Sequence, residues 1–392
     1  METSFASPPR RISPEGCERP RFTVDGSDEL EAFLAESCEG VRSAVMAALP
    51  PNSIEGLLLA GGYGRGEGGV ASSESDRPYN DLEFYLFVRN NPLIYEHRHR
   101  TALANVTHGL SEAIGIEVEI KIISLAKLRR APVSIFFYDM IAGHKWLIGD
   151  DELLRGCAHH RAAHLIPLSE ATRLLMNRCS GLLFAREQFG AAPFLPKNAD
   201  FIRRNIAKAQ LSFGDAILAA YGRYHWSCRE RHERLRKFDF ALPWRSELLE
   251  HHRRGVAFKL HPWRSAESHD QLARDLDSAT CFAGKLWLWW ESTRLHHSFI
   301  SARHYCTSAV RKWPDSNRWR NLLLNLKAFR RPVLTFRHPR EPVLEALSIL
   351  LWEPVALTDP TLRQALVCRL RYQSNDFSSA VAAYRRLWAA VN

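Results

Sequence analysis

A glycine-rich stretch followed by two carboxylates is the part of this 392-residue sequence whose residue types could do chemistry. The stretch "AGGYGRGEGGV" (residues 60–70) places six glycines around Arg65, and "DLEFYLFV" (residues 81–88) carries Asp81 and Glu83. Glycine leaves backbone N–H groups accessible, so such a turn can cradle phosphate oxygens. Residues two apart on a strand face the same way, and paired carboxylates suit Mg²⁺. The pattern predicts a phosphate held next to a divalent metal ion.

Other interpretations of the glycines can be weighed from the sequence. Gly64, Gly66 and Gly69 satisfy the dinucleotide-binding pattern GxGxxG, but that pattern opens directly into a helix. Here it is followed by "VASSESDRPYND", which Pro78 interrupts, so a loop is expected instead. A P-loop is excluded because no Lys-Ser or Lys-Thr pair follows. A flexible surface hinge, which glycine clusters often form, stays open as an alternative.

The order of these features resembles the nucleotidyltransferase fold of the DNA polymerase beta superfamily. The family signature is a hydrophobic residue, Gly-Gly or Gly-Ser, a spacer, and then Asp-x-Asp or Asp-x-Glu. Residues 60–62 ("AGG") and 81–83 ("DLE") follow that signature. Gly62, Arg65 and "PYNDLEF" (residues 78–84) are locally most similar to the kanamycin-type (aminoglycoside) nucleotidyltransferases.

The resemblance covers residues 54–124 and departs from the family pattern in two places. The segment "VASSESD" makes the spacer longer than the family usually shows. Gly62 stands where a serine often follows the first glycine, so only a backbone N–H is left there to bind phosphate. Neither departure removes the acidic residues.

The resemblance implies an enzyme that moves a nucleoside monophosphate from an NTP, for which we expect ATP, to a hydroxyl acceptor with the help of Mg²⁺. Asp81 and Glu83 would hold the metal, in a site for one or two ions. Glu119, on the next expected strand, would complete the metal set and receive the proton of the hydroxyl, with Glu117 on the same face as the alternative. Considered alone, Asp81 and Glu83 would instead be interpreted as the solvated face of an edge strand.

The phosphates of the nucleotide would be bound by the glycine turn. The backbone N–H groups of Gly61 and Gly62 would contact the β- and γ-phosphates, and Arg65 would add charge-assisted hydrogen bonds. In the kanamycin-type enzymes the helical part also supplies a cation to the phosphates, and Lys208 is our candidate for that role. Arg204 and Lys208 lie four residues apart, so a solvated helix face is the competing interpretation.

The helices and strands predicted around these residues indicate an α+β fold, in which a small α/β module with a mixed sheet is followed by a larger all-helical region. Ser27 is a good N-cap for a helix that ends before Pro50, and Gly115 is a plausible end for another. The alternating segments "DLEFYLFV" and "IEVEIKIIS" and the apolar run "SIEGLLLAGG" predict strands. We expect a disordered tail over residues 1–22, a nucleotidyltransferase-like domain over 23–150, and a helical domain over 151–392 with a possible division near 240–265.

The net charge of +10 is unevenly distributed along the chain. Residues 1–150 hold 15 Lys and Arg against 21 Asp and Glu, a balance of −6, whereas residues 151–392 carry +16. A basic half favours anionic partners and suits nucleotide addition to RNA, while the local resemblance favours a small-molecule acceptor. A non-catalytic nucleotide- or RNA-binding protein that retains the fold is a third hypothesis.

Composition narrows the class of protein. Apolar residues make up 46% and charged residues 24%, which is ordinary for a soluble globular protein. No apolar run is long enough for a membrane span, and the N-terminus lacks the apolar segment of a secretory signal. The eight cysteines form no CxxC pair, which indicates reduced thiols and a cytoplasmic location rather than a disulfide framework or a zinc ribbon.

Overall fold

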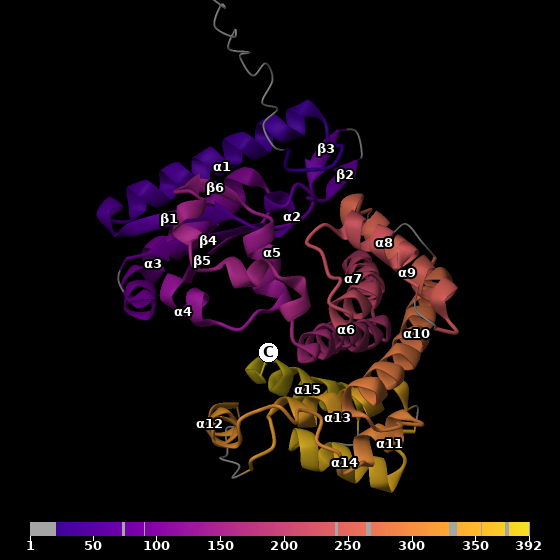
Figure 1. Ribbon diagram of the computed structural model, residues 1–392. Helices are drawn as coiled ribbons and strands as arrows, with labels where there is room; N and C mark the ends of the chain where they lie inside the picture. Colours follow the sequence, from indigo (N-terminus) through magenta and orange to yellow (C-terminus); the bar gives the residue numbers. More distant parts are fainter. Residues whose placement is uncertain are drawn as a thin grey trace, which may run out of the picture.

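The protein consists of an α/β module and a larger helical region, seen in a computed structural model (Figure 1). The structure describes residues 21–72, 75–89, 91–239, 242–263, 268–328, 335–353, 355–372 and 376–391. None of the helices in these ranges is long and apolar enough to cross a membrane. The expected α+β class, a small mixed sheet followed by helices, is therefore confirmed.

The first helix, α1 (Asp28–Ala48), forms as its sequence predicts. The Ser27 side chain accepts a hydrogen bond from the Leu30 N–H, and acidic residues fill the first turn. Leu34, Val41 and Val45 are buried against the sheet, which gives the helix its tertiary support. It ends before the prolines at residues 50 and 51, which cannot continue an α-helix.

The four-stranded sheet has the order β5-β4-β1-β6, with β4 parallel to β5 and β1 antiparallel to both β4 and β6. Apolar residues of α1 and α3 cover one face, and α4, α5 and the segment after β6 cover part of the other. The elements are β1 (Ile54–Leu59), β4 (Leu82–Val88), α3 (Pro92–Ile114), β5 (Val118–Ile123), α4 (Leu125–Arg130), α5 (Ile135–Ala142) and β6 (Lys145–Ile148).

The segment between the glycines and β4 differs from the expected loop. After the short helical turn α2 (Gly61–Gly64), the strands β2 (Val70–Ser72) and β3 (Asp76–Pro78) pair as a small antiparallel sheet. The buried hydroxyl of Tyr63 stabilises it, because it donates to the Gly69 carbonyl at 2.9 Å and accepts from the Tyr79 N–H at 2.9 Å. Three-residue strands are too short to show an alternating pattern, so they could not be predicted from the residues.

The expected disordered tail also differs at its end. Residues 1–20 of that tail lie outside the described part of the chain. Residues 21 and 22 belong to the fold, since the Phe22 N–H donates to Glu31 Oε2 at 2.7 Å and the Phe22 carbonyl accepts from the Gly68 N–H at 3.0 Å. The module therefore begins before residue 23 and holds the glycine-rich stretch from its N-terminal side.

The helical region surrounds one continuous apolar core that extends from Val133 to Leu387. In α7 the apolar spacing of the sequence places Ile202, Ile206, Phe213 and Ile217 in the core, whereas Tyr221, which continues the same spacing, is the exposed C-cap residue. Figure 1 shows α7 and α8 beside the glycine turn and α11–α15 farther from the module. In chain order the helices are α6 (Leu168–Phe189), α7 (Pro196–Ala220), α8 (Cys228–Lys237), α9 (Arg245–Leu260), α10 (His269–Leu295), α11 (Ala302–Thr307), α12 (Arg318–Ala328), α13 (Arg340–Trp352), α14 (Pro360–Leu370) and α15 (Phe377–Val391).

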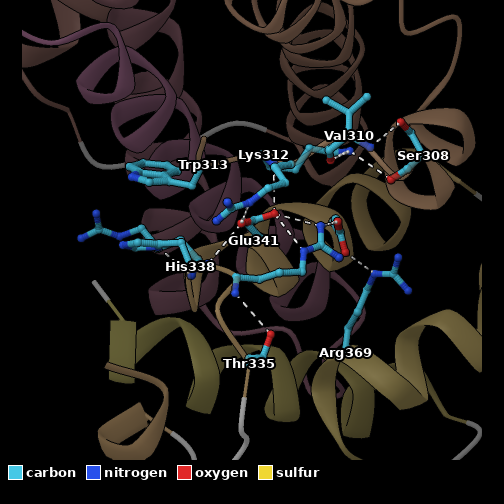
Figure 2. A network of polar contacts seen from close by, with 12 residues as sticks. Ser308, Val310, Lys312, Trp313, Thr335, His338, Glu341 and Arg369 are labelled. Carbon is cyan, nitrogen blue, oxygen red and sulfur yellow. Dashed lines mark hydrogen bonds and ion pairs between the residues drawn. The ribbon is translucent and has the colours of Figure 1, made fainter. Parts of the chain in front are cut away.

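A buried network of ion pairs ties the C-terminal helices together. Figure 2 shows Glu341 of α13 between Lys312, His338 and Arg369, and the Lys312 N–H donates to its Oε2 at 3.0 Å. One turn further along α13, Glu345 accepts hydrogen bonds from the side chains of Arg337 at 2.7 Å and Arg369 at 2.6 Å. Several arginines of the basic half are thus paired with carboxylates inside the protein.

We expect Glu345→Ala to lower the free energy of unfolding by about 2–3 kcal/mol, because it leaves Arg369 without its buried counter-charge while Arg337 keeps partial solvation. Glu233→Ala, which removes a surface pair with Arg236, is the control and should cost less than about 1 kcal/mol. Urea unfolding followed by circular dichroism measures both. Equal losses would show that the Glu345 network adds nothing beyond a surface pair.

Candidate active site

The end of β1 leads into a turn whose backbone requires glycine. Gly61 has a φ of 65°, in the left-handed region that residues with a Cβ seldom adopt. A Cβ on Gly61 would lie 3.1 Å from Glu83 Oε1, so the absent side chain also makes room for this carboxylate. The Ala60 N–H donates to the Glu83 carbonyl at 2.9 Å. The glycine turn and the Glu83 side chain are therefore in direct contact.

The three predicted carboxylates lie on one face of the sheet. Asp81 directly precedes β4, two residues before Glu83, and the parallel register places Glu83 opposite Glu119 on β5. Glu117 is exposed just before β5, and its backbone carbonyl accepts from the Leu82 N–H at 2.9 Å. The register thus favours Glu119 over Glu117 as the neighbour of Glu83.

Glu119 is not gathered into a metal cluster with the other two. It forms an ion pair with Lys121, which lies two residues further along β5. Among the described residues, no group of three His, Cys, Asp or Glu side chains is close enough to hold a metal ion. The structure therefore brings Asp81 and Glu83 together and leaves Glu119 beside them, engaged by a lysine.

The environment of Glu83 disfavours its negative charge. Burial, followed by the neighbouring charge of Asp81, raises the pKa of Glu83 above its ordinary value, while Lys121 and Arg65 partly oppose this shift. The Tyr85 hydroxyl donates to Glu83 Oε2 at 3.2 Å. A cation placed between Asp81 and Glu83 would remove this electrostatic penalty.

The helical region contributes unpaired positive charges to the same place. Lys208 of α7 is exposed, yet burial first, and then the positive charges of Arg178 and Arg204, lower its pKa, while Asp81 opposes the shift. Neither the side chain of Lys208 nor that of the half-buried Arg178 of α6 has a hydrogen bond or ion pair with any residue in the described ranges.

Lys259 of α9 lies over the glycine turn, although no sequence feature marked it. A Cβ built on Gly62 would be 3.4 Å from the Lys259 Nζ. Burial and then the charge of Arg65 lower the pKa of Lys259, and Glu67 opposes this shift. Within the described part of the chain this ammonium group also has no hydrogen bond or ion pair. Arg178 and Lys259 were missed because they lie far from the motif in sequence and in ordinary helical patterns.

Arg65 occupies a different place from the one expected. Its Nη1 pairs with Asp139 Oδ2 of α5 at 3.4 Å, and the Tyr224 hydroxyl donates to the same oxygen at 3.2 Å. Arg231 Nη1 donates to the Tyr224 hydroxyl at 3.1 Å and Arg231 Nε pairs with Asp215 at 2.6 Å. Arg65 is thus the first member of a buried polar chain that joins the module to the helical region. It still influences Glu83 through its charge.

Glu67 fastens the glycine-rich stretch to the helical region. Its buried carboxylate accepts hydrogen bonds from the Ser227 hydroxyl at 2.5 Å and from the Cys228 N–H at 2.8 Å, at the start of α8. These bonds lower the pKa of Glu67 overall, although burial acts to raise it. A carboxylate is also favourable at a helix N-terminus. The stretch is therefore anchored at both ends and at Glu67, which argues against the surface-hinge interpretation.

Comparison with known proteins adds no assignment: no protein-family model matches the chain, and no curated protein is significantly similar to it. Any functional assignment therefore has to come from the geometry of this site.

The raised pKa of Glu83 predicts a pH-dependent stability. A carboxyl group whose pKa is higher in the folded than in the unfolded state destabilises the fold when pH rises through that interval, and the penalty persists above it. Glu83→Gln should therefore raise the Tm at pH 7.5 and change it much less at pH 4, where Glu83 is already largely protonated. The exposed Glu117→Gln serves as the control and should alter neither value. A fall in Tm for Glu83→Gln at pH 7.5 would show that ionised Glu83 is stabilising.

Proposed function

We propose that this protein is a Mg²⁺-dependent nucleotidyltransferase that moves a nucleoside monophosphate from an NTP, with ATP as the expected donor, to a hydroxyl acceptor. The observation that carries the proposal is that two sets of charges without partners lie within electrostatic reach of each other, with Lys259 over the glycine turn and Lys208 influenced by Asp81. Asp81 and Glu83 repel each other, and Lys208, Arg178 and Lys259 are without counter-ions among the described residues. In a metal–triphosphate complex, the metal ion would neutralise the two carboxylates and the phosphates would neutralise the three basic side chains.

The residues present fit a Mg²⁺ ion at the carboxylates. Asp81 and Glu83 offer the hard oxygen ligands that Mg²⁺ prefers, and a cation would relieve the repulsion between them. Glu119 would join them once Lys121 releases it. When bound, Mg²⁺ would supply charge neutralisation for the phosphates and polarisation of the reacting oxygens.

The residues of the chain would bind and orient the nucleotide and accept the proton of the acceptor hydroxyl. Gly61 and Gly62 offer backbone N–H groups to the phosphates, and Lys259 adds its charge directly above the turn. Lys208 would neutralise the charge of the pyrophosphate from the side of α7. The acceptor oxygen attacks the α-phosphorus, the bond to the pyrophosphate oxygen breaks with its electron pair, and the hydroxyl proton passes to Glu119.

A small-molecule acceptor is the first expectation, because the glycine turn and "PYNDLEF" are locally similar to the kanamycin-type enzymes. Addition to RNA is the alternative, since the ion pairs of Arg231, Arg294 and Arg369 lie within the basic half and leave its balance of +16 unchanged. The segments "HPWRS" (residues 261–265) and "KAFRRP" (residues 327–332) interleave aromatic and basic residues, which also suits RNA, but each lies partly outside the described residues. A non-catalytic nucleotide- or RNA-binding protein is the remaining alternative. All seven described cysteines are free thiols, which agrees with the cytoplasmic location we propose.

An acceptor screen with labelled ATP and Mg²⁺, read out as pyrophosphate release and product mass, tests the reaction. We expect Asp81→Asn and Glu83→Gln each to lower turnover by at least about 10³-fold, since each removes a group that stabilises transition-state charge. Glu117→Gln is the matched acidic control and should retain activity. Turnover that survives in Asp81→Asn would refute the metal assignment. Nucleotide binding without turnover of any small hydroxyl compound or RNA would favour the non-catalytic alternative.

The helical cations give a second prediction. Lys259→Ala and Lys208→Ala should each weaken ATP binding roughly tenfold to a hundredfold, the value of one charge-assisted hydrogen bond of about 1.5–3 kcal/mol. Lys197→Ala, at the exposed start of the same α7 helix, is the matched control for Lys208. Isothermal titration calorimetry with ATP in Mg²⁺ measures all three. If all three variants bind equally well, the phosphates are not held by these lysines.

A further inference from the structure

A cavity of about 1000 Å³ lies at the back of the glycine turn and has no role in the proposed reaction. Gly64 and Arg65 form part of its wall, whereas neither Asp81 nor Glu83 lines it. The rest of the wall comes from α1, from the edge strand β6 and from Trp226 in the loop before α8. Its volume reaches the upper end of the range of small-molecule pockets, about 300–1000 Å³.

Three aromatic side chains from separate parts of the chain line this cavity. Phe22 precedes α1, Trp146 belongs to β6, and Trp226 comes from the helical region, and each is only partly buried. Trp146 is fixed in place because its indole N–H donates to Asp151 Oδ1 at 2.9 Å. Lys145 lies 5.1 Å from the centre of the Phe22 ring. These rings offer apolar faces against which a planar ligand ring can pack.

The cavity is also strongly basic. Basic side chains outnumber acidic ones in its wall: Arg21, Arg42, Arg65, Lys145 and Arg161 against Glu39 and Asp151. The Arg42 pair with Glu39 at 2.5 Å and the Arg161 pair with Asp151 at 3.5 Å are both at the surface. Such surface pairs contribute at most about 1 kcal/mol, so these guanidinium groups can turn to a ligand anion at little cost.

We propose that this cavity is a second ligand site, which binds a small molecule that joins a planar aromatic ring to a phosphate or carboxylate group. The ring would pack between Phe22, Trp146 and Trp226. The anionic group would be bound by Arg42 and Arg161, in the bidentate geometry that guanidinium groups favour. The proposal is independent of the nucleotidyltransferase reaction, because it uses neither carboxylate of the candidate active site.

Calorimetric titration of the full chain with 1-naphthyl phosphate tests the site, with 1-naphthol and inorganic phosphate as the separate halves of the probe and 1-naphthoate as the carboxylate form. We expect 1-naphthyl phosphate or 1-naphthoate to bind at least tenfold more tightly than either half. Whichever of the two binds better identifies the anionic group of the ligand. Absence of binding by both, or equal binding by 1-naphthol alone, would overturn the proposal.

Substitutions in the cavity wall test whether the probe binds there. The double variant Arg42→Gln/Arg161→Gln changes two exposed side chains and should weaken the better probe at least tenfold. The double variant Arg236→Gln/Arg253→Gln removes two arginines that are likewise exposed and paired with surface carboxylates, and should leave binding unchanged. Lys208→Ala should also leave it unchanged. Loss of probe binding in Lys208→Ala, or full binding in Arg42→Gln/Arg161→Gln, would place the probe elsewhere and refute the site.

Discussion

The hydrogen bonds of Glu67 with the start of α8 are the constraint on which the candidate site depends. They join the glycine-rich stretch of the module to the helical region at a buried position. Lys208, Arg178 and Lys259 all come from the helical region, whereas Asp81 and Glu83 come from the module. Without a fixed relation between the two parts, these two sets of charges would not lie at a common place.

A second set of polar contacts also joins the module to the helical region. The chain from Arg65 through Asp139, Tyr224 and Arg231 to Asp215 alternates donors and acceptors across the boundary between module and helices. Burial raises the pKa of Asp139, and the charges of Arg65 and Arg231 oppose that rise. Because a buried network is costly when any member lacks its partner, this chain specifies one arrangement of the two parts more sharply than apolar packing would.

The sequence predicted those features that depend on local rules. The cap at Ser27, the end of α3 at Gly115 and the alternation in β4 and β5 each follow from neighbouring residues. That β4 and β5 pair, with Glu83 opposite Glu119, was expected only from the family resemblance. The β2–β3 hairpin and β6 are too short to show a period. The partner of Arg65 could not be foreseen, because Asp139 is 74 residues away and meets it only through the packing of α5. Lys259 and Arg178 were unforeseeable for the same reason.

The unpaired charges at the turn are what distinguish this site from the other ionic groups of the molecule. The arginines around Glu341 and Glu345 are paired with carboxylates, as charges removed from water usually must be. Lys208 and Lys259, by contrast, have pKa values lowered by burial and by other cations, with Asp81 and Glu67 close enough to oppose those shifts but not bonded to them. An unpaired charge costs little at the exposed Lys208, but it is unfavourable at Lys259, which is partly buried over the glycine turn. Charges of opposite sign that interact without being bonded to each other could be neutralised together by a ligand that carries both signs, which is the premise of the proposed function.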